Sequence, residues 1–193
     1  MSEKIRCFIA LPVDEKIRQG AKKLVSSLQG LPTRVSWVRP SNLHLTIRFL
    51  GDQEQSFLPA LHKALESACQ DLPTFELQYQ KLGAFPPKRA PRTLWVGVGG
   101  ELETLHRLND NLTKELSSLG IPKEKRQFSP HLTLGRVRKH LSYAQWTSAS
   151  AQLGLVDLGS CKVSKCLLMK SELQKGQAPI YSSIATIELG ARA

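Results

Sequence analysis

The sequence predicts an α+β fold of two similar, interleaved lobes, with antiparallel sheets lining a central cleft and helices outside. Three observations predict it. Segments with strand and helix periodicity alternate along all 193 residues, no linker or low-complexity segment separates the halves, and each half carries a His-x-Thr motif on a strand-like segment. The motifs are His44-Leu45-Thr46-Ile47 and His131-Leu132-Thr133-Leu134. We therefore expect residues 1–193 to form a single bilobal domain with one motif in each lobe.

The first half reads as strands and helices in alternation. Pro12 stops an apolar run, Asp14 is placed to cap a helix, and Gly51 follows the first motif as a strand-ending turn residue. The predicted elements are strands over 5–11, 35–38, 43–50 and 75–79, helices over 14–28 and 57–68, and a turn at 40–42.

The second half repeats that order. Residues 83–92 are rich in proline, which removes backbone donors, so we expect a basic loop there. The remaining predicted elements are a strand over 94–98, a helix over 102–116, a basic loop over 120–129, the second His-containing strand, a helix over 142–152, and strands near 153–158, 162–173 and 181–189.

The charge balance favours a polyanionic partner. The chain carries 27 basic against 16 acidic residues, a formal net charge of +11, which raises the local concentration of nucleic acid. Its four cysteines lack zinc-ligand spacing, which fits reduced thiols in the cytoplasm. No signal-peptide or membrane-spanning segment is apparent, so we expect a soluble cytoplasmic protein without a membrane partner.

The motifs place polar groups on one face of each strand. Because side chains at i and i+2 share a face, His44 and Thr46 point one way while Leu45, Ile47 and Phe49 point into the core. The second motif repeats this alternation, with His131 and Thr133 opposite Leu132 and Leu134. Two histidines are thereby expected to face each other in a wet cleft.

These groups suit acid–base chemistry at a phosphate. One imidazole can accept a proton while the other donates one, and each threonine hydroxyl can donate a hydrogen bond to a phosphoryl oxygen. Arg48 has the parity to add positive charge in the cleft or to cap its mouth, whereas Arg136 reaches the cleft only if Gly135 introduces a bulge or the strand ends there. Facing histidines could instead bind a metal, but no third ligand stands at ligand spacing, so we expect neither metal nor cofactor.

At these residues the chain resembles the 2H phosphoesterase superfamily, named for its paired His-x-Thr-x motifs. The most similar group is the bacterial and archaeal RNA 2′,3′-cyclic phosphodiesterases, formerly called 2′-5′ RNA ligases. The matching segments are 8–11, 37–38, 42–46, 49–51, 92–95, Phe128, 130–134, Arg136 and Tyr181.

The resemblance implies hydrolysis of a 2′,3′-cyclic phosphate at an RNA 3′ end to a 2′-phosphate. By the family pattern His44 is the proton donor, His131 the proton acceptor, and Thr46 and Thr133 hold the non-bridging oxygens. Phe8 and Arg136 match ligand-contacting positions, while the basic loops 83–92 and 120–129 would contact RNA phosphates without sequence preference.

Three alternatives stay open on the sequence. The reverse reaction, 2′-5′ RNA ligation, would use the same residues. A non-catalytic RNA-binding module would keep the cleft without turnover. A phosphodiesterase for small cyclic nucleotides or ADP-ribose cyclic phosphate would need less positive charge. We expect a monomer whose partner is RNA with a 2′,3′-cyclic phosphate end, tRNA fragments and small cyclic nucleotides included.

Overall fold

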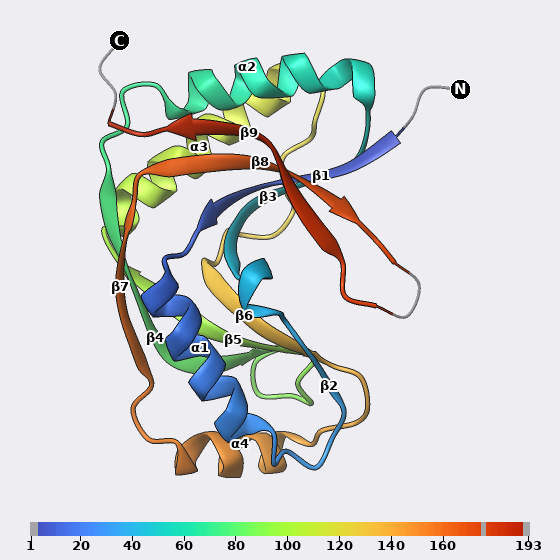
Figure 1. Cartoon of the computed structure of the whole chain (residues 1–193), viewed down its shortest axis with the longest axis vertical. Coiled ribbons are helices and arrows are strands. Elements are labelled where there is room, and N and C mark those ends of the chain that lie inside the picture. Colours follow the sequence, from blue (N-terminus) through green and yellow to red (C-terminus); the bar gives the residue numbers. More distant parts are fainter. Residues whose placement is uncertain (1–3, 175–176, 191–193) are drawn as a thin grey trace.

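One antiparallel sheet runs through the whole structure (Figure 1). The computed structural model describes residues 4–174 and 177–190, so the ends of the predicted 1–193 domain lie outside the described residues. The elements are β1 (Lys4–Pro12), α1 (Glu15–Leu28), β2 (Val35–Trp37), η1 (Pro40–Asn42), β3 (His44–Glu54), η2 (Gln55–Phe57), α2 (Leu58–Cys69), β4 (Phe75–Phe85), β5 (Thr93–Gly100), α3 (Leu102–Ser118), β6 (His131–Val137), α4 (Tyr143–Gln152), β7 (Asp157–Val163), β8 (Lys165–Glu172) and β9 (Ile180–Glu188).

The sheet consists of two strand sets that meet at one contact. Its order is β7-β4-β5-β6-β3-β1-β8-β9, with β2 paired to the end of β6. We call β3, β1, β8 and β9 the first set, and β7, β4, β5 and β6 the second set. The sets are joined where Leu45 of β3 pairs with Leu132 of β6. The α+β fold with a curled antiparallel sheet and helices outside is thereby confirmed.

The chain crosses repeatedly between the two sets. After β1 of the first set it runs through α1, which packs against β7 of the second set, and returns as β3. Helices α2 and α3 pack against each other at one end of the molecule, beside β8 and β9, while α1 and α4 lie at the other end (Figure 1). Because of this crossing, each set contains strands from both halves of the sequence.

The helices begin and pack as their sequences predict. The Asp14 side chain accepts a hydrogen bond from the Ile17 amide and caps α1, and Ser142 forms a capping box with Gln145 at the start of α4. The buried face of α3 is a row of leucines at helical spacing. Its members are Leu105, Leu108, Leu112 and Leu116.

Three predicted boundaries are wrong. Strand β3 does not end at Gly51, because this glycine (φ +71°) lies beside a register shift opposite Cys7 and the strand continues to Glu54. Residues 83–85 are not loop, since they pair with 93–95 and the proline-rich segment starts only at position 86. No strand begins at 153, because Leu153 and Gly154 close α4; strand β7 starts at 157 instead.

Two further predictions concern the cysteines, expected as reduced thiols, and the absence of a membrane-spanning segment. Cys7, Cys69, Cys161 and Cys166 are all free and buried, and burial raises the pKa of the Cys7 and Cys161 thiols. None of the helices in the described part of the chain combines the length and the apolar character that crossing a bilayer requires.

Candidate active site

The two His-x-Thr motifs flank the contact between the strand sets. Leu45 and Leu132 pair there, and both side chains are fully buried in the core. Neighbouring residues on a strand point to the opposite face, so His44, Thr46, His131 and Thr133 surround this contact on one face of the sheet. We call it the histidine face. Two motifs 87 positions apart in the sequence therefore lie on adjoining strands, as the motif repeat predicts.

A bulge in β3 changes the face on which the residues after the first motif lie. Ala10 pairs with Thr46 but Ile9 pairs with Arg48, so Ile47 is an extra residue on β3. Arg48 is consequently buried and Phe49 is 60% exposed. The predicted orientations of both residues are wrong, because they assumed strict alternation through position 47. Arg48 does not reach the histidine face.

A matching bulge in β6 turns Arg136 toward the site. Trp95 pairs with Thr133 but Leu94 pairs with Gly135, which leaves Leu134 as the extra residue. Arg136 therefore shares a face with Thr133, and its charge acts on both His131 and Tyr181. The strand registers make Phe49 and Arg136 equivalent positions, each two places past its bulge. One set thus presents an aromatic ring where the other presents a guanidinium.

The ring orientation of each histidine is set by a backbone carbonyl two residues earlier. His44 Nδ1 lies 2.7 Å from the Asn42 oxygen, and His131 Nδ1 lies 2.7 Å from the Ser129 oxygen. A carbonyl oxygen only accepts, so Nδ1 carries the proton in both rings and Nε2 is left for chemistry. In neutral His44, the Thr46 hydroxyl donates to Nε2 across 3.0 Å.

Two aromatic rings hold His44 in place. The Phe8 ring centroid lies 4.8 Å from that of His44, and the Tyr181 ring meets the imidazole edge-on at 5.3 Å. Phe8 also contacts Tyr181 at 5.1 Å and Phe49 at 6.3 Å. The structure thus places Phe8 on the histidine face but covers it, since it is only 3% exposed. Its ring supports the imidazole from beneath.

His131 has its own pair of aromatic neighbours. Phe85 meets the imidazole edge-on at 5.0 Å and Trp95 lies 6.2 Å away. Trp95 lies directly over Gly83, where a Cβ would stand 2.2 Å from the indole Cη2. Glycine is therefore required at position 83 for the indole to occupy this position beside His131.

Burial makes both imidazoles poor bases in the free protein. Desolvation lowers the pKa of His44, against the hydrogen bond to the Asn42 carbonyl, which raises it. Desolvation likewise lowers the pKa of His131, and the Arg136 charge lowers it further, against the Ser129 hydrogen bond. Both rings are consequently neutral near pH 7, and an anion bound between them would favour protonation.

Arg48, which follows the first motif, positions the loop before the second histidine. The Arg48 guanidinium donates a hydrogen bond to the Pro122 carbonyl, and its Nε lies 3.9 Å from Glu124 Oε1. Both partners belong to the segment between α3 and β6. Arg48 therefore tethers the loop that leads into His131. Strict alternation along the strand does not predict this structural contact.

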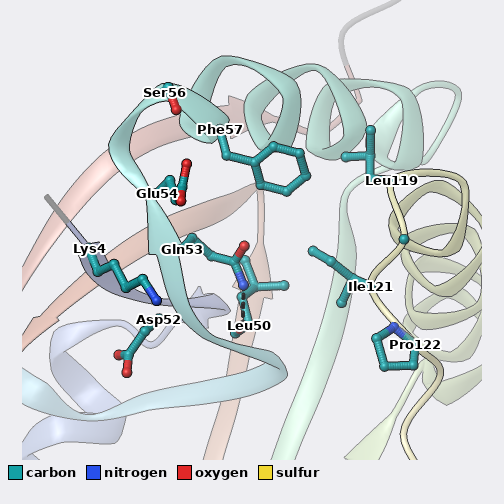
Figure 2. Close-up of a pocket in the computed structure, with 11 residues that line it drawn as sticks. Lys4, Leu50, Asp52, Gln53, Glu54, Ser56, Phe57, Leu119, Ile121 and Pro122 are labelled. Carbon is teal, nitrogen blue, oxygen red and sulfur yellow. Dashed lines mark hydrogen bonds between the residues drawn. The ribbon is translucent and has the colours of Figure 1, made fainter. Parts of the chain in front are cut away.

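The structure has a cavity that neither motif histidine lines (Figure 2). It has a volume of about 520 Å³, an apolar wall that includes Phe57 and Ile121, and Asp52, Glu54 and Lys4 at its other side. None of the predicted site residues lines it. Two carboxylates beside one lysine make it a poor site for a phosphate.

A smaller cavity is basic and adjoins the end of β6. Its volume is about 320 Å³, and its lining includes the basic side chains of Arg92, Arg138 and Lys139. Arg138 Nε donates to Ser36 Oγ, the residue that pairs with Arg136. Arg136 itself is not among the residues that line this cavity. Among the described residues, no group of three or more His, Cys, Asp or Glu side chains is placed to hold a metal ion.

Sequence reasoning did not assign a role to several residues of the site. The sequence indicates no role for Phe85 and Trp95, Tyr181 matches the family pattern without one, and alternation predicts Phe49 in the core. The sequence does contain a signal for Phe49: the second motif has one more residue before its arginine, which aligns Arg136 with Phe49 rather than with Arg48.

Known proteins resemble this chain in sequence and in fold. A family model described as LigT-like phosphoesterase matches residues 11–95 and again 96–181, so that each match contains one motif. The RNA 2′,3′-cyclic phosphodiesterase of Archaeoglobus fulgidus is 36% identical over 95% of this chain and 100% of its own length. That of Methanothermobacter thermautotrophicus is 31% identical over 96% and 100%.

Solved structures show the same fold at lower identity. TT0787 of Thermus thermophilus superimposes with a TM-score of 0.82 at 24% identity, covering 97% of this chain and 100% of its own. E. coli LigT complexed with 3′-AMP gives a TM-score of 0.78 at 23% identity, with coverage of 98% and 100%. The family match over nearly the whole described chain confirms the resemblance seen in the motifs: this chain belongs to the LigT-like phosphoesterase family of the 2H superfamily.

Proposed function

We propose that this protein hydrolyses 2′,3′-cyclic phosphates at RNA 3′ ends and leaves a 2′-phosphate. The observation that carries the proposal is the pair of imidazoles flanking the Leu45–Leu132 contact, each with Nδ1 held by a carbonyl and Nε2 left for proton transfer. Relatives that are 31–36% identical over nearly their full length are RNA 2′,3′-cyclic phosphodiesterases, which supports the reaction class.

In the proposed mechanism the two histidines act from opposite sides of the phosphorus. His131 Nε2 removes a proton from water as the water oxygen bonds to phosphorus, and the P–O3′ bond breaks. Protonated His44 gives its Nε2 proton to the departing O3′, so that the product is a 2′-phosphomonoester and a free 3′-hydroxyl. Each proton transfer of this kind is worth about 10²- to 10⁴-fold in rate.

The asymmetry of the site supports this division of roles. Desolvation lowers the pKa of His131 and the Arg136 charge, which has no counterpart among the causes at His44, lowers it further, so that this imidazole is neutral and able to accept a proton. The negative charge of a bound phosphate diester would favour protonation of His44, whose Nε2 then has a proton to donate. Thr46 and Thr133 share the face with both rings, where their hydroxyls can donate to the non-bridging oxygens.

Charge supports RNA as the substrate class. The chain has a formal net charge of +11, and the basic cavity at the end of β6, lined by Arg92, Arg138 and Lys139, would offer phosphate contacts to nucleotides preceding the cyclic end. Its arginine and lysine side chains suit sequence-independent binding of a backbone. We propose that the chain acts as one bilobal, monomeric unit in the cytoplasm, without a metal or cofactor.

Product analysis in EDTA tests the proposal. An oligoribonucleotide with a 2′,3′-cyclic phosphate end is incubated with protein and followed by ³¹P NMR, with His62→Ala as a control for loss of a histidine outside the site. We expect conversion to the 2′-phosphate by the wild type and by the control. A 3′-phosphate, joined RNA, loss of turnover in EDTA, or bound but unconverted RNA would each contradict the proposal.

A further inference from the structure

Asn42 makes two hydrogen bonds that lead to His44 by different routes. Its backbone oxygen lies 2.7 Å from His44 Nδ1 and accepts the proton of that nitrogen. Its side-chain Nδ2 donates to the Pro179 carbonyl across 2.8 Å, between positions that are 137 apart in the sequence. One residue therefore contacts both the imidazole and the segment that leads into β9.

The Asn42 side chain ties a closed turn to the start of strand β9. Within the turn, the Asn42 amide donates to the Arg39 carbonyl at 2.8 Å and the Leu43 amide donates to the Pro40 carbonyl at 3.2 Å. These bonds fix the shape of the turn but not its place relative to β9. Pro179 directly precedes β9, so its carbonyl lies outside the β8–β9 ladder. The side-chain amide supplies the partner that the ladder does not.

The same bond holds the end of β9 that carries Tyr181. Tyr181 follows two residues after Pro179. Its ring meets the His44 imidazole edge-on at 5.3 Å and contacts Phe8 at 5.1 Å. Strand β9 is at the edge of the sheet, with β8 as its neighbour, so its first residues are attached from one side. The bond from Asn42 attaches them from a second side.

The position of this imidazole matters for one proton transfer in particular. In the proposed reaction His44 Nε2 gives its proton to the departing O3′, which requires the two atoms within hydrogen-bond distance. The ring is rigid, so a displaced Asn42 carbonyl would move Nε2 together with Nδ1. Desolvation lowers the pKa of His44 whereas the bond to this carbonyl raises it, so the same bond also favours the protonated form.

We propose that Asn42 is a positioning residue for general-acid catalysis by His44: its side-chain bond to the Pro179 carbonyl fixes the backbone carbonyl that orients the imidazole. The inference rests on the proposed hydrolysis of RNA 2′,3′-cyclic ends and adds to it a residue that acts through His44. The loop before His131 is held differently, by Arg48. Loss of the Asn42 side chain should therefore affect the first histidine and spare the second.

Turnover by N42A on two substrates separates positioning from a general loss of structure. The substrates are oligonucleotides with 2′,3′-cyclic ends, one normal and one with sulfur in place of O3′, whose thiolate leaves without a proton from His44. N111A is the matched control, because Asn111 Nδ2 also donates to a part-buried carbonyl, that of Ala68, at 3.1 Å. Folding of both variants is checked by circular dichroism.

We expect N42A to lower kcat on the normal substrate by about 10- to 100-fold, up to the cost of a catalytic group misplaced by about 1 Å. On the sulfur substrate its kcat should stay within about threefold of the wild type, because proton donation is not required there. N111A should stay within about twofold of the wild type on both substrates, because its bond joins α2 to α3.

A second measurement on the free protein does not depend on turnover. In protein labelled with ¹⁵N-histidine, the Nδ1 signal of His44 reports the bond to the Asn42 carbonyl, and that of His131 reports the bond to the Ser129 carbonyl. N42A should shift the His44 signal and leave the His131 signal in place. N111A should shift neither.

Several results would overturn the inference. Equal losses on both substrates, or failure of N42A to fold while N111A folds, would make Asn42 a residue of the fold as a whole. Wild-type kcat of N42A on the normal substrate, or an unmoved His44 signal, would mean that the imidazole is held without this side chain. If the wild type converts neither substrate, the proposed function fails and the catalytic part of the inference with it, whereas the His44 signal still decides whether Asn42 orients the ring.

Discussion

Replacing Gly83 by alanine is expected to disturb the second histidine from a distance. Gly83 lies under the Trp95 indole, and an added Cβ would stand 2.2, 2.4 and 2.5 Å from three of its ring carbons. Ordinary contacts begin near 3.4 Å, so the ring must move by at least about 1 Å. Within the described chain the indole N–H finds no hydrogen-bond acceptor, so packing alone holds the ring.

The movement should affect both stability and turnover. Overpacking of a well-packed site costs typically about 1–3 kcal/mol of unfolding free energy. Trp95 lies 5.0 Å from Phe85 and 6.2 Å from His131, so its displacement would shift the imidazole. A misplacement of about 1 Å in a catalytic group can cost on the order of 10²-fold in rate.

Two measurements on matched variants check this prediction. Urea unfolding gives the change in stability, and kcat/KM on a 2′,3′-cyclic-ended oligonucleotide gives the change in activity. Gly30→Ala is the control, because nothing lies within 4 Å of a Cβ there; its stability should stay within about 0.5 kcal/mol of the wild type and its activity should be unchanged.

A second substitution separates crowding from other effects. In the G83A background, Trp95→Leu removes the ring that the new methyl group meets, and it should restore part of the lost stability. If G83A alone has the wild-type kcat/KM and unfolding midpoint, the indole does not position His131 in the way proposed here.

Three further predictions concern the charged and titrating groups. The maximum of kcat/KM in the pH–rate profile should lie below about pH 6.5, because burial lowers the pKa values of both histidines. Activity rises with pH as His131 loses its proton and falls as His44 loses its own. A maximum above pH 7 would contradict this. Arg136→Gln should reduce kcat/KM by about 10²-fold and move the acid limb of that profile to higher pH, since loss of the positive charge raises the pKa of His131. An acid limb that does not move would place Arg136 outside the site. Arg48→Met should lower the unfolding free energy by about 1–3 kcal/mol, because the Pro122 carbonyl loses a charged donor. Its kcat at 25 °C should stay within about threefold of the wild type. A large loss of kcat in a stable variant would give Arg48 a role in catalysis.

The periodicity of the sequence predicts most of the fold. The cap at Asp14, the leucine face of α3 and the strand nature of both motifs are local properties, and the structure confirms them. Strict alternation fails only where an extra residue enters a strand. Ile47 and Leu134 are such residues, and no composition signal marks the first of them.

Two consequences follow for reading the site from sequence. The predicted faces of Arg48 and Phe49 are wrong because the bulge at Ile47 inverts the alternation of the residues that directly follow it. The Gly135 in the second motif gave a reason to expect a bulge there, and it occurs. The aromatic residues around His131 could not be predicted, because Phe85 and Trp95 approach the imidazole only through the pairing of β4, β5 and β6.

The central claim is that His44 and His131 have separate roles at one phosphate. Turnover by H44A and H131A is best measured on two oligonucleotides with 2′,3′-cyclic ends, one normal and one with sulfur in place of O3′. On the normal substrate each variant should lose about 10²- to 10⁴-fold in rate. A thiolate, whose conjugate thiol has a pKa near 8.5, leaves without the protonation that an alkoxide needs. H44A should therefore recover most of its loss on the sulfur substrate and H131A should not. Recovery by H131A instead, or full activity of either variant on the normal substrate, would contradict the account.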